Sequence, residues 1–292
     1  MIDQLSHNSN DEVLIVNDGS IDGTGKFLDL WSKDNPALRV LNNKAPGLVN
    51  ALNLGVKECS NEWIARFDVD DTYSLQRLDV QEKAIESNTA AIFSDYAIAT
   101  RNGRILSKVR SAISSEATRI SLIQNRRTPH PGVIFNRCAV QSVGGYILDD
   151  FPCEDLSLWL RLSKHDQIRT VPFELMKYRI NPGSISSTQN AKMISKKREV
   201  LKKHPLSQAE IIDFVSRFDE YVELVSSSTM AVNRIASLLQ EIQQCSNLFG
   251  YSLPKTKNIV SQSTFINASN LAKENIRNFY ELVIRNSYKK IS

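Results

Sequence analysis

The feature that most constrains the fold is an alternation of short apolar runs with segments of helical periodicity in the first part of the chain. Apolar runs occur at 13–16, 38–43 and 62–67, and segments with apolar residues on one helical face lie between them at 26–34 and 48–59. Continuous apolar runs are typical of strands covered on both faces. The strand–helix–strand order predicts βαβ units, and therefore an α/β fold with a mostly parallel central sheet and helices on both faces.

The remaining segments extend this pattern up to about residue 188. We expect a hairpin around Asn102 and Gly103. After residue 188 strand signals mostly disappear, so we expect a catalytic-type domain at 1–190 and a helical region at 191–292. Further helices are predicted at 74–87, 113–125 and 154–165, and further strands at 90–100, 131–140 and 167–180.

Composition narrows the classes of function. The net charge of +4 over 292 residues is mild and does not indicate nucleic-acid binding. The first ten residues lack the pattern of a signal peptide, and no apolar run approaches the ~18 residues that span a bilayer. The four cysteines and four histidines are scattered, without CxxC or HxxxH spacing. We therefore expect reduced, buried thiols, no histidine zinc site and a cytoplasmic location.

Acidic residues follow two of the predicted strands. Asp18 follows the run at 13–16, and Asp68, Asp70 and Asp71 follow the run at 62–67. In open α/β sheets ligands bind beyond the carboxyl ends of strands, where such turns meet. Crowded carboxylates suit a hard divalent cation, so we expect Mg²⁺ or Mn²⁺ held together with a phosphorylated metabolite.

Two other interpretations of the acidic turn remain open at this level. Aspartate also favours solvated turns and helix N-caps, which would explain the cluster without any ligand. A calcium loop is disfavoured, because Tyr73 occupies the sixth position where such loops need glycine.

Glu154 and Asp155 stand where the helix at 154–165 begins. An acidic residue there can simply cap the helix and match its dipole. The same dipole favours an ionised carboxylate, so Asp155 could instead accept a proton from a hydroxyl nucleophile. Spacing alone does not decide between the two.

Seven motifs in order resemble the family-two glycosyltransferases, which have the A-type nucleotide-sugar fold. The resemblance covers about residues 11–188 and is strongest to bacterial enzymes that build lipopolysaccharide, O-antigen or capsule. It implies an inverting transfer of sugar from a nucleotide-diphosphate donor, most simply a UDP-sugar, to a hydroxyl of a glycan or lipid-linked acceptor. The motifs are NDGSIDGT, GLVNALNLGV, EWIARFDVDD, HPGVIF, GGY, EDLSLWLRL and KYRINPGSIS.

The resemblance also implies roles for individual residues. Asp18 would contact the nucleotide base, although Asn17 stands where the family usually has a first aspartate. Asp70 would bind the metal, Asp68 the ribose or the metal, and Asp71 would support them. Asp155 matches the catalytic base, with Glu154 beside it. His130 lies in the His-x-Gly segment near the acceptor side, where a histidine that only caps a strand is an equal alternative.

The chain departs from this family at its start, because residues 1–10 resemble only the end of the family's first helix. The strand that normally precedes that helix has no counterpart here, so the runs at 13–16 and 62–67 would face a gap or pair directly. We favour a shortened reading frame. The alternatives are a strand supplied by another chain, or an inactive relative that binds a nucleotide or a partner protein.

Two further hypotheses concern the rest of the chain. The segment 191–204 has six Lys and Arg residues against Glu199, which would suit an anionic membrane surface at the inner face of the membrane. A solvated helix face is the favoured explanation. A nucleotidyltransferase would share the acidic metal site, but that chemistry has no need of a distant carboxylate base at Asp155.

Overall fold

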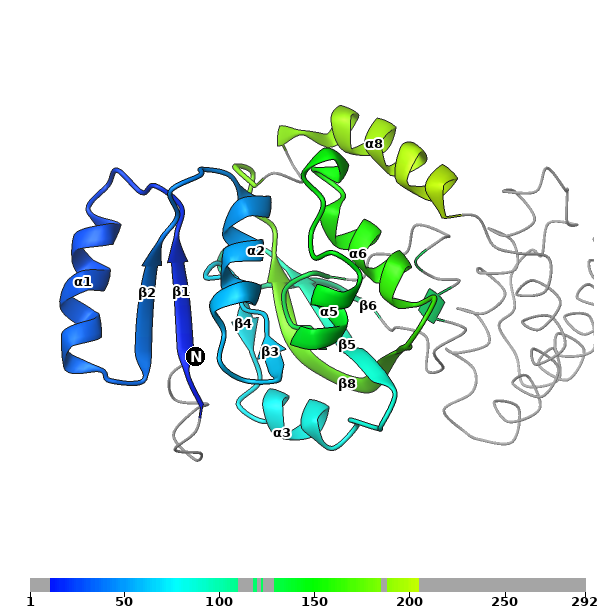
Figure 1. Ribbon diagram of the computed structural model, residues 1–292, viewed down its shortest axis with the longest axis horizontal. Coiled ribbons are helices and arrows are strands. Elements are labelled where there is room, and N and C mark those ends of the chain that lie inside the picture. Colours follow the sequence, from blue (N-terminus) through cyan, green and yellow to red (C-terminus); the bar gives the residue numbers. More distant parts are fainter. Residues whose placement is uncertain (1–10, 110–117, 120–121, 123–128, 185–187, 205–292) are drawn as a thin grey trace, which may run out of the picture. The chain divides into compact units, whose positions relative to one another are not determined.

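The computed structural model describes residues 11–109, 118–119, 122, 129–184 and 188–204 (Figure 1). It divides the chain into two compact units, 1–205 and 206–292, and the description below concerns the first of them. Strands and helices alternate through this unit, as the sequence predicts, and the α/β class is confirmed. The division into 1–190 and 191–292 stays a prediction.

The first strands form a small parallel sheet. Strand β1 (Val13–Asn17) pairs in parallel with β2 (Leu38–Asn42), and helix α1 (Thr24–Asp34) connects them. Helix α2 (Leu48–Glu58) follows and packs against β1. Glu12 holds the end of this sheet, because its carboxylate accepts hydrogen bonds from Arg39 at 2.7 Å and from the Ser60 amide at 2.5 Å. The βαβ unit expected from the apolar runs is therefore present.

The larger sheet is mixed rather than mostly parallel, which corrects one detail of the expected fold. Its strand order is β3-β7-β5-β8-β4, with β6 also paired to β5. Only β5 and β8 run parallel, and every other pairing is antiparallel. The strands are β3 (Trp63–Ala65), β4 (Thr72–Tyr73), β5 (Thr89–Ala99), β6 (Ile105–Val109), β7 (Ile134–Asn136) and β8 (Gln167–Arg179).

Strands β1 and β3 do not pair directly. Within the described part of the chain, β1 has β2 as its sole strand partner and β3 has β7. The residues of β3 are only half-buried, as are all those of β1 except Val13. Each strand therefore keeps one edge without a described strand neighbour, which is the first of the two arrangements that the sequence left open.

The segment expected as a strand at 131–140 is half strand and half helix. Strand β7 ends at Asn136, whose side-chain oxygen accepts a hydrogen bond from the Ala139 amide at 3.0 Å and so caps helix α5 (Arg137–Ser142). The helix expected at 74–87 is shorter, α3 (Arg77–Glu82). Most of the helix expected at 113–125 lies outside the described residues. The hairpin at Asn102–Gly103 is present between β5 and β6.

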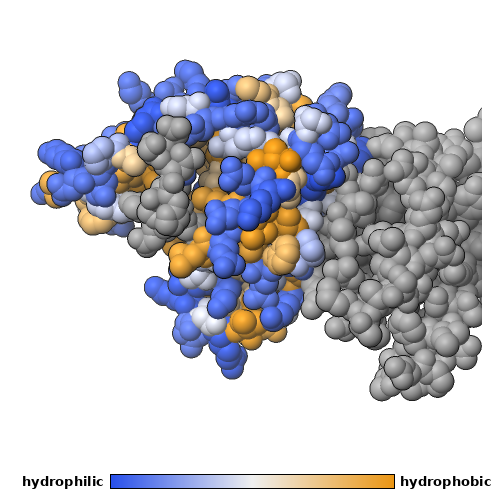
Figure 2. Space-filling model, turned by 90° about the horizontal axis from the view of Figure 1, so that it is seen from below, coloured by the Kyte–Doolittle hydropathy of each residue, from blue (hydrophilic) through white to orange (hydrophobic). Residues whose placement is uncertain are grey.

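Helix α6 (Glu154–Leu162) lies at the centre of the core, and Trp159 is fully buried there. Its ring meets Phe93 edge-on at 5.2 Å between centroids. On the face shown in Figure 2, hydrophobic residues gather in the middle of the described unit and hydrophilic residues surround them. The expectation of buried thiols holds for Cys153, whereas Cys59 is half-buried and Cys138 is exposed on α5.

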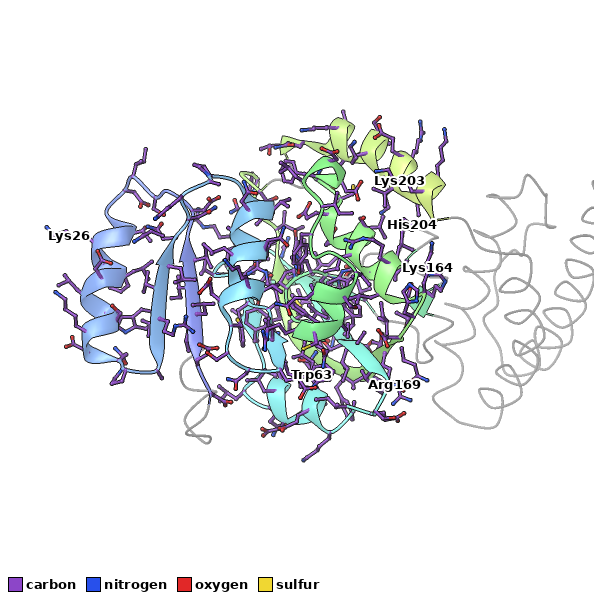
Figure 3. All side chains as sticks on the ribbon, in the orientation of Figure 1. Lys26, Trp63, Lys164, Arg169, Lys203 and His204 are labelled. Atoms are coloured by element: carbon purple, nitrogen blue, oxygen red, sulfur yellow. The ribbon has the colours of Figure 1, made fainter. Side chains whose placement is uncertain are left out.

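Helix α8 (Asn190–Lys203) is anchored to the start of α6. The short 3₁₀ helix η2 (Leu148–Asp150) contributes Asp150, which is 1% exposed. Its carboxylate accepts hydrogen bonds from Ser157 at 2.5 Å and from Lys203 at 2.6 Å. Figure 3 shows Lys203 at the end of α8. Val200 of the same helix is fully buried in the core. No helix in the described ranges is long and apolar enough to cross a membrane.

Candidate active site

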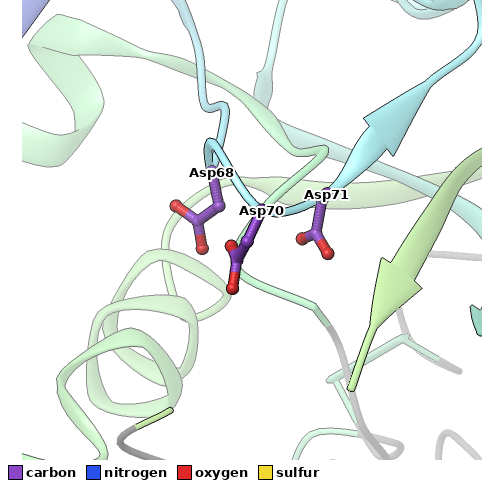
Figure 4. A group of neighbouring side chains, drawn as sticks. All are labelled: Asp68, Asp70 and Asp71. Carbon is purple, nitrogen blue, oxygen red and sulfur yellow. The ribbon is translucent and has the colours of Figure 1, made fainter. Parts of the chain in front are cut away.

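The acidic turn lies between β3 and β4 and brings three carboxylates together. One oxygen from each of Asp68, Asp70 and Asp71 lies within 4.8 Å of the others. Figure 4 shows the three side chains on the same side of the turn. The turn itself is closed by the Asp71 amide, which donates to the Asp68 carbonyl at 3.3 Å. The structure therefore groups these side chains as expected.

Arg179, the last residue of β8, contacts this turn through both its backbone amide and its side chain. Its amide donates to Asp71 Oδ1 at 2.7 Å, and its Nε donates to the Asp70 carbonyl oxygen. Strand β8 pairs with β4 directly beside the turn. A residue more than a hundred positions away thus fixes the acidic loop, and no spacing in the sequence indicated it.

The charges of the turn are only partly compensated. Arg66 forms an ion pair with Asp68. Burial raises the pKa of Asp68, the Arg66 guanidinium opposes this rise, and Asp70 adds to it. Burial and the two neighbouring aspartates raise the pKa of Asp71 to about 6, against the Arg179 amide, which lowers it.

The set of donors fits a divalent cation. Asp71 Oδ2 is buried and has no hydrogen-bond partner in the described part of the chain. An ionised oxygen in that state is costly unless a cation binds it. The three side chains offer only oxygen ligands, which hard cations such as Mg²⁺ and Mn²⁺ prefer. The residues present therefore suit the metal that the sequence predicts, and they argue against a purely solvated turn.

A second acidic pair stands at the start of α6. Glu154 is 5% exposed and its Oε2 has no hydrogen-bond partner among the described residues, while Asp155 is half-buried. Burial, then the Asp155 charge, raise the pKa of Glu154 to about 7. Burial also raises the pKa of Asp155, opposed by the Leu156 amide at 2.6 Å and by Lys197. The expectation that Asp155 is a carboxylate at neutral pH stays a prediction.

Charges at the acidic turn act on the acidic pair of α6. The charge of Asp68 raises the pKa of Asp155, and the charge of Arg66 lowers that of Glu154. The acidic turn and the start of α6 therefore lie close enough to interact electrostatically.

His130 takes part in a buried hydrogen bond. Its Nε2 lies 2.8 Å from the hydroxyl of Tyr146, which is 3% exposed. Burial, then Arg66, lower the pKa of His130 well below its usual value, so the ring is neutral at physiological pH. Asn53 holds Tyr146 in place through its amide and carbonyl groups, each at 2.8 Å. His130 thus positions Tyr146 near the acidic pair, a contact that the sequence did not indicate.

Asp18 is exposed at the end of β1 and serves the first sheet. Its carboxylate accepts hydrogen bonds from the Gly47 amide at 3.0 Å and from Asn43 at 2.8 Å. It ties the ends of β1 and β2 to the start of α2. No described contact joins Asp18 to the acidic turn, so its expected role toward the nucleotide stays a prediction.

The fold is that of the A-type nucleotide-sugar transferases. Solved structures of this class resemble the chain at low sequence identity, which shows the fold. TarS 1–349 of S. aureus, solved with UDP-GlcNAc, superposes with a TM-score of 0.55 at 14% identity over 83% of this chain and 75% of that one. The mannosyltransferase PcManGT of Pyrobaculum calidifontis, solved with GDP-Man and Mn²⁺, gives 0.51 at 13% identity over 96% and 77%.

The sequence comparisons point to the same class of protein. Residues 1–144 match the model of glycosyl transferase family 2. It is 29% identical over 187 residues to an uncharacterized glycosyltransferase of Rickettsia felis, covering 62% of this chain and 30% of that protein. It is 28% identical over 187 residues to the Escherichia coli UDP-Glc:alpha-D-GlcNAc-diphosphoundecaprenol beta-1,3-glucosyltransferase WfgD, covering 62% and 70%. The chain spans less than a third of the first curated relatives.

The raised pKa of Glu154 makes a prediction for stability. A carboxyl with a folded pKa of about 7 and an ordinary value of 4.5 stabilises the fold while protonated, so stability falls as pH rises between these values. The free energy of unfolding should fall by about 3 kcal/mol over this pH range. Glu154→Gln should make this fall less steep, leaving the contributions of Asp68, Asp71 and Asp155. Urea unfolding followed by tryptophan fluorescence at pH 5 and pH 8 measures this change in the free energy of unfolding.

The matched control is Glu82→Gln, which removes an exposed carboxyl of α3. It should leave the pH dependence as in the wild type. Equal slopes for the wild type and Glu154→Gln would contradict the desolvated state of Glu154.

Proposed function

We propose that this chain is a metal-dependent, inverting glycosyltransferase that moves a sugar from a UDP-sugar to a hydroxyl of a lipid-linked or glycan acceptor in cell-surface polysaccharide synthesis. The observation that carries this proposal is the pairing of two acidic sites: a three-carboxylate turn with an unsatisfied buried oxygen, and a carboxyl pair coupled to it electrostatically. The match of residues 1–144 to glycosyl transferase family 2 and the similarity to the UDP-Glc glucosyltransferase WfgD support the same activity.

The first site would hold the donor's diphosphate. Asp70 and Asp71 would bind Mn²⁺ or Mg²⁺ with Asp68, and the bound cation would supply charge neutralisation for the departing nucleoside diphosphate. Arg66 holds Asp68 by its ion pair, and Arg179 donates to the Asp71 carboxylate and to the Asp70 carbonyl, so the ligands would need little rearrangement. Asp18 would contact the base at the edge of the first sheet.

The second site would handle the acceptor's proton. The acceptor oxygen attacks the anomeric carbon from the face opposite the diphosphate and forms the new glycosidic bond. The bond from the anomeric carbon to the diphosphate oxygen breaks, and its electron pair leaves with the nucleoside diphosphate. Asp155 takes the hydroxyl proton, a task for which its raised pKa suits it better than an ordinary aspartate. Attack from the opposite face inverts the configuration.

Donor binding provides the first test. Calorimetry with UDP should show binding that is much stronger with Mn²⁺ than with EDTA. Asp70→Asn should weaken the Mn²⁺-dependent binding by roughly ten- to a hundredfold, because an ionised ligand is lost. Asp149→Asn removes an exposed aspartate outside the turn and should bind as the wild type does. Equal affinities with Mn²⁺ and EDTA would contradict the metal role of the turn.

The base is tested separately. Asp155→Asn should lower the rate of sugar transfer by roughly 10²–10⁴-fold while Mn²⁺–UDP affinity stays nearly unchanged, because proton acceptance is lost and the donor site is kept. Transfer is followed as UDP release in the presence of a GlcNAc-diphospholipid acceptor. Transfer at the normal rate would refute the assignment of Asp155.

One observation favours a second candidate function. One edge of β1 and one edge of β3 lack a described strand partner. This would suit a relative that binds a nucleotide or a protein without catalysis. The two tests above separate these functions, since a non-catalytic binder would bind Mn²⁺–UDP but release no UDP from a UDP-sugar.

Helix α8 supports a peripheral contact with the cytoplasmic face of a membrane. Lys192, Arg198 and Lys202 are exposed on it, while Lys203 anchors it to Asp150. Exposed Ile194 adds an apolar side chain to the same surface. A lipid-linked acceptor would lie at such a surface, and anionic lipids attract each nearby cation by about 1 kcal/mol.

Co-sedimentation with vesicles tests this contact. Replacing Lys192, Arg198 and Lys202 together by glutamine should weaken binding to vesicles with anionic lipid by roughly a hundredfold. Replacing the exposed Lys26, Lys33 and Lys83 by glutamine removes the same charge elsewhere and should change binding little. Binding that ignores the anionic lipid content would contradict the contact.

A further inference from the structure

A fully buried arginine lies behind the acidic turn. Arg77, the first residue of α3, is 0% exposed. Its Nη1 donates to the Arg66 carbonyl at 2.9 Å, whereas its Nε and Nη2 have no hydrogen-bond partner among the described residues. Burial lowers its pKa to about 10, so it remains a cation at neutral pH. No ion pair compensates this cation in the described part of the chain, and burying an uncompensated charge is costly.

The guanidinium instead lies against two aromatic rings that contact each other. Its central carbon lies 3.9 Å from the centre of the Phe67 ring and 4.9 Å from that of Tyr73. The two rings meet edge-on at 4.7 Å. A planar cation over ring faces is a favourable arrangement, and more so when water is excluded.

These two aromatic residues flank the acidic turn on either side. Phe67 directly precedes Asp68, and Tyr73 directly follows Thr72. The Tyr73 hydroxyl accepts a hydrogen bond from the Asp68 amide at 2.7 Å and donates to the Asp68 carbonyl at 3.3 Å. Arg77 therefore touches both ends of the turn at once, and also the carbonyl of Arg66 just before it.

We infer that Arg77 is a positioning residue for the metal ligands, acting through Phe67 and Tyr73. Three carboxylates close together repel one another and would spread the turn apart. Contact with both flanking rings holds its ends together and keeps the carboxylate oxygens at a spacing that one cation can bridge. An apolar side chain could fill the same space, but it could neither attract both rings electrostatically nor donate to the Arg66 carbonyl. The inference rests on the proposed metal-dependent function.

The test compares Arg77→Met and Arg77→Lys with the wild type in the full chain. Arg77→Met keeps an unbranched apolar stem and removes the buried charge, a change that often preserves folding. It should weaken Mn²⁺ binding in the presence of UDP by ten- to a hundredfold. The Mn²⁺ concentration that gives half-maximal transfer should rise by the same factor. The kcat at saturating Mn²⁺ should stay near the wild-type value. Arg77→Lys keeps the charge without the planar group and should give an intermediate result.

The control is Gln81→Met, one helical turn further along α3. Gln81 is also 0% exposed and donates to the carbonyls of Ile92 and Gly132, both at 2.9 Å, but it has no described contact with Phe67 or Tyr73. It should lower stability and leave Mn²⁺ affinity unchanged. Equal losses of affinity in Gln81→Met and Arg77→Met would assign the effect to general damage of the core and overturn the inference.

Hydrogen exchange gives a readout that needs no metal. The Asp68 amide is protected by the Tyr73 hydroxyl, so Arg77→Met should speed exchange in residues 67–73 at least tenfold more than in β5. Unchanged exchange at the turn overturns the inference even if the wild type binds Mn²⁺–UDP. Failure of the wild type to bind Mn²⁺–UDP would instead contradict the proposed function. Should Arg77→Met not fold, Arg77→Lys decides by the same two measurements.

Discussion

The described unit depends on the compensation of closely spaced negative charges in the acidic turn after β3 and at the start of α6. Five carboxyl groups face this region, and burial raises the pKa of four of them, Asp68, Asp71, Glu154 and Asp155. Surrounding cations approach from separate segments. Arg66 pairs with Asp68, Arg179 donates to the Asp71 carboxylate and to the Asp70 carbonyl, and Lys197 lowers the pKa of Asp155. The compensation is incomplete, which is consistent with the further cation that we propose.

Local signals in the sequence predict much of this architecture. Helix α2 and helix α6 follow from their apolar periodicity, and the long strand β5 from its continuous apolar run. The acidic turn is predictable because its three aspartates lie within four positions, so the backbone brings them together whatever the rest of the fold does. The parallel pair of β1 and β2 follows from the helix between them.

Features that depend on distant parts of the chain are not predictable in this way. An apolar run does not show the direction of its partner, and so the antiparallel pairing of β3 with β7 was missed. The cap at Asn136 turns an apolar run into a helix after three residues of strand. Arg179 and Tyr146 carry no local sign of their roles, because β8 and the loop after α5 bring them to the site only through tertiary contacts. Desolvation at Asp155 likewise depends on the packed core.

The anchoring of α8 has a consequence for how this protein is divided. This helix inserts Val200 into the same core as Trp159, and its Lys203 neutralises the buried Asp150 immediately before α6. The carboxyl pair that would serve as base therefore rests on a segment that the sequence assigns to a separate helical region. Removal of everything after residue 190 would leave the buried Asp150 without the Lys203 cation. It would also leave a cavity lined by apolar side chains beside α6. The packing that supports Glu154 and Asp155 thus extends beyond the residue at which strand signals end in the sequence.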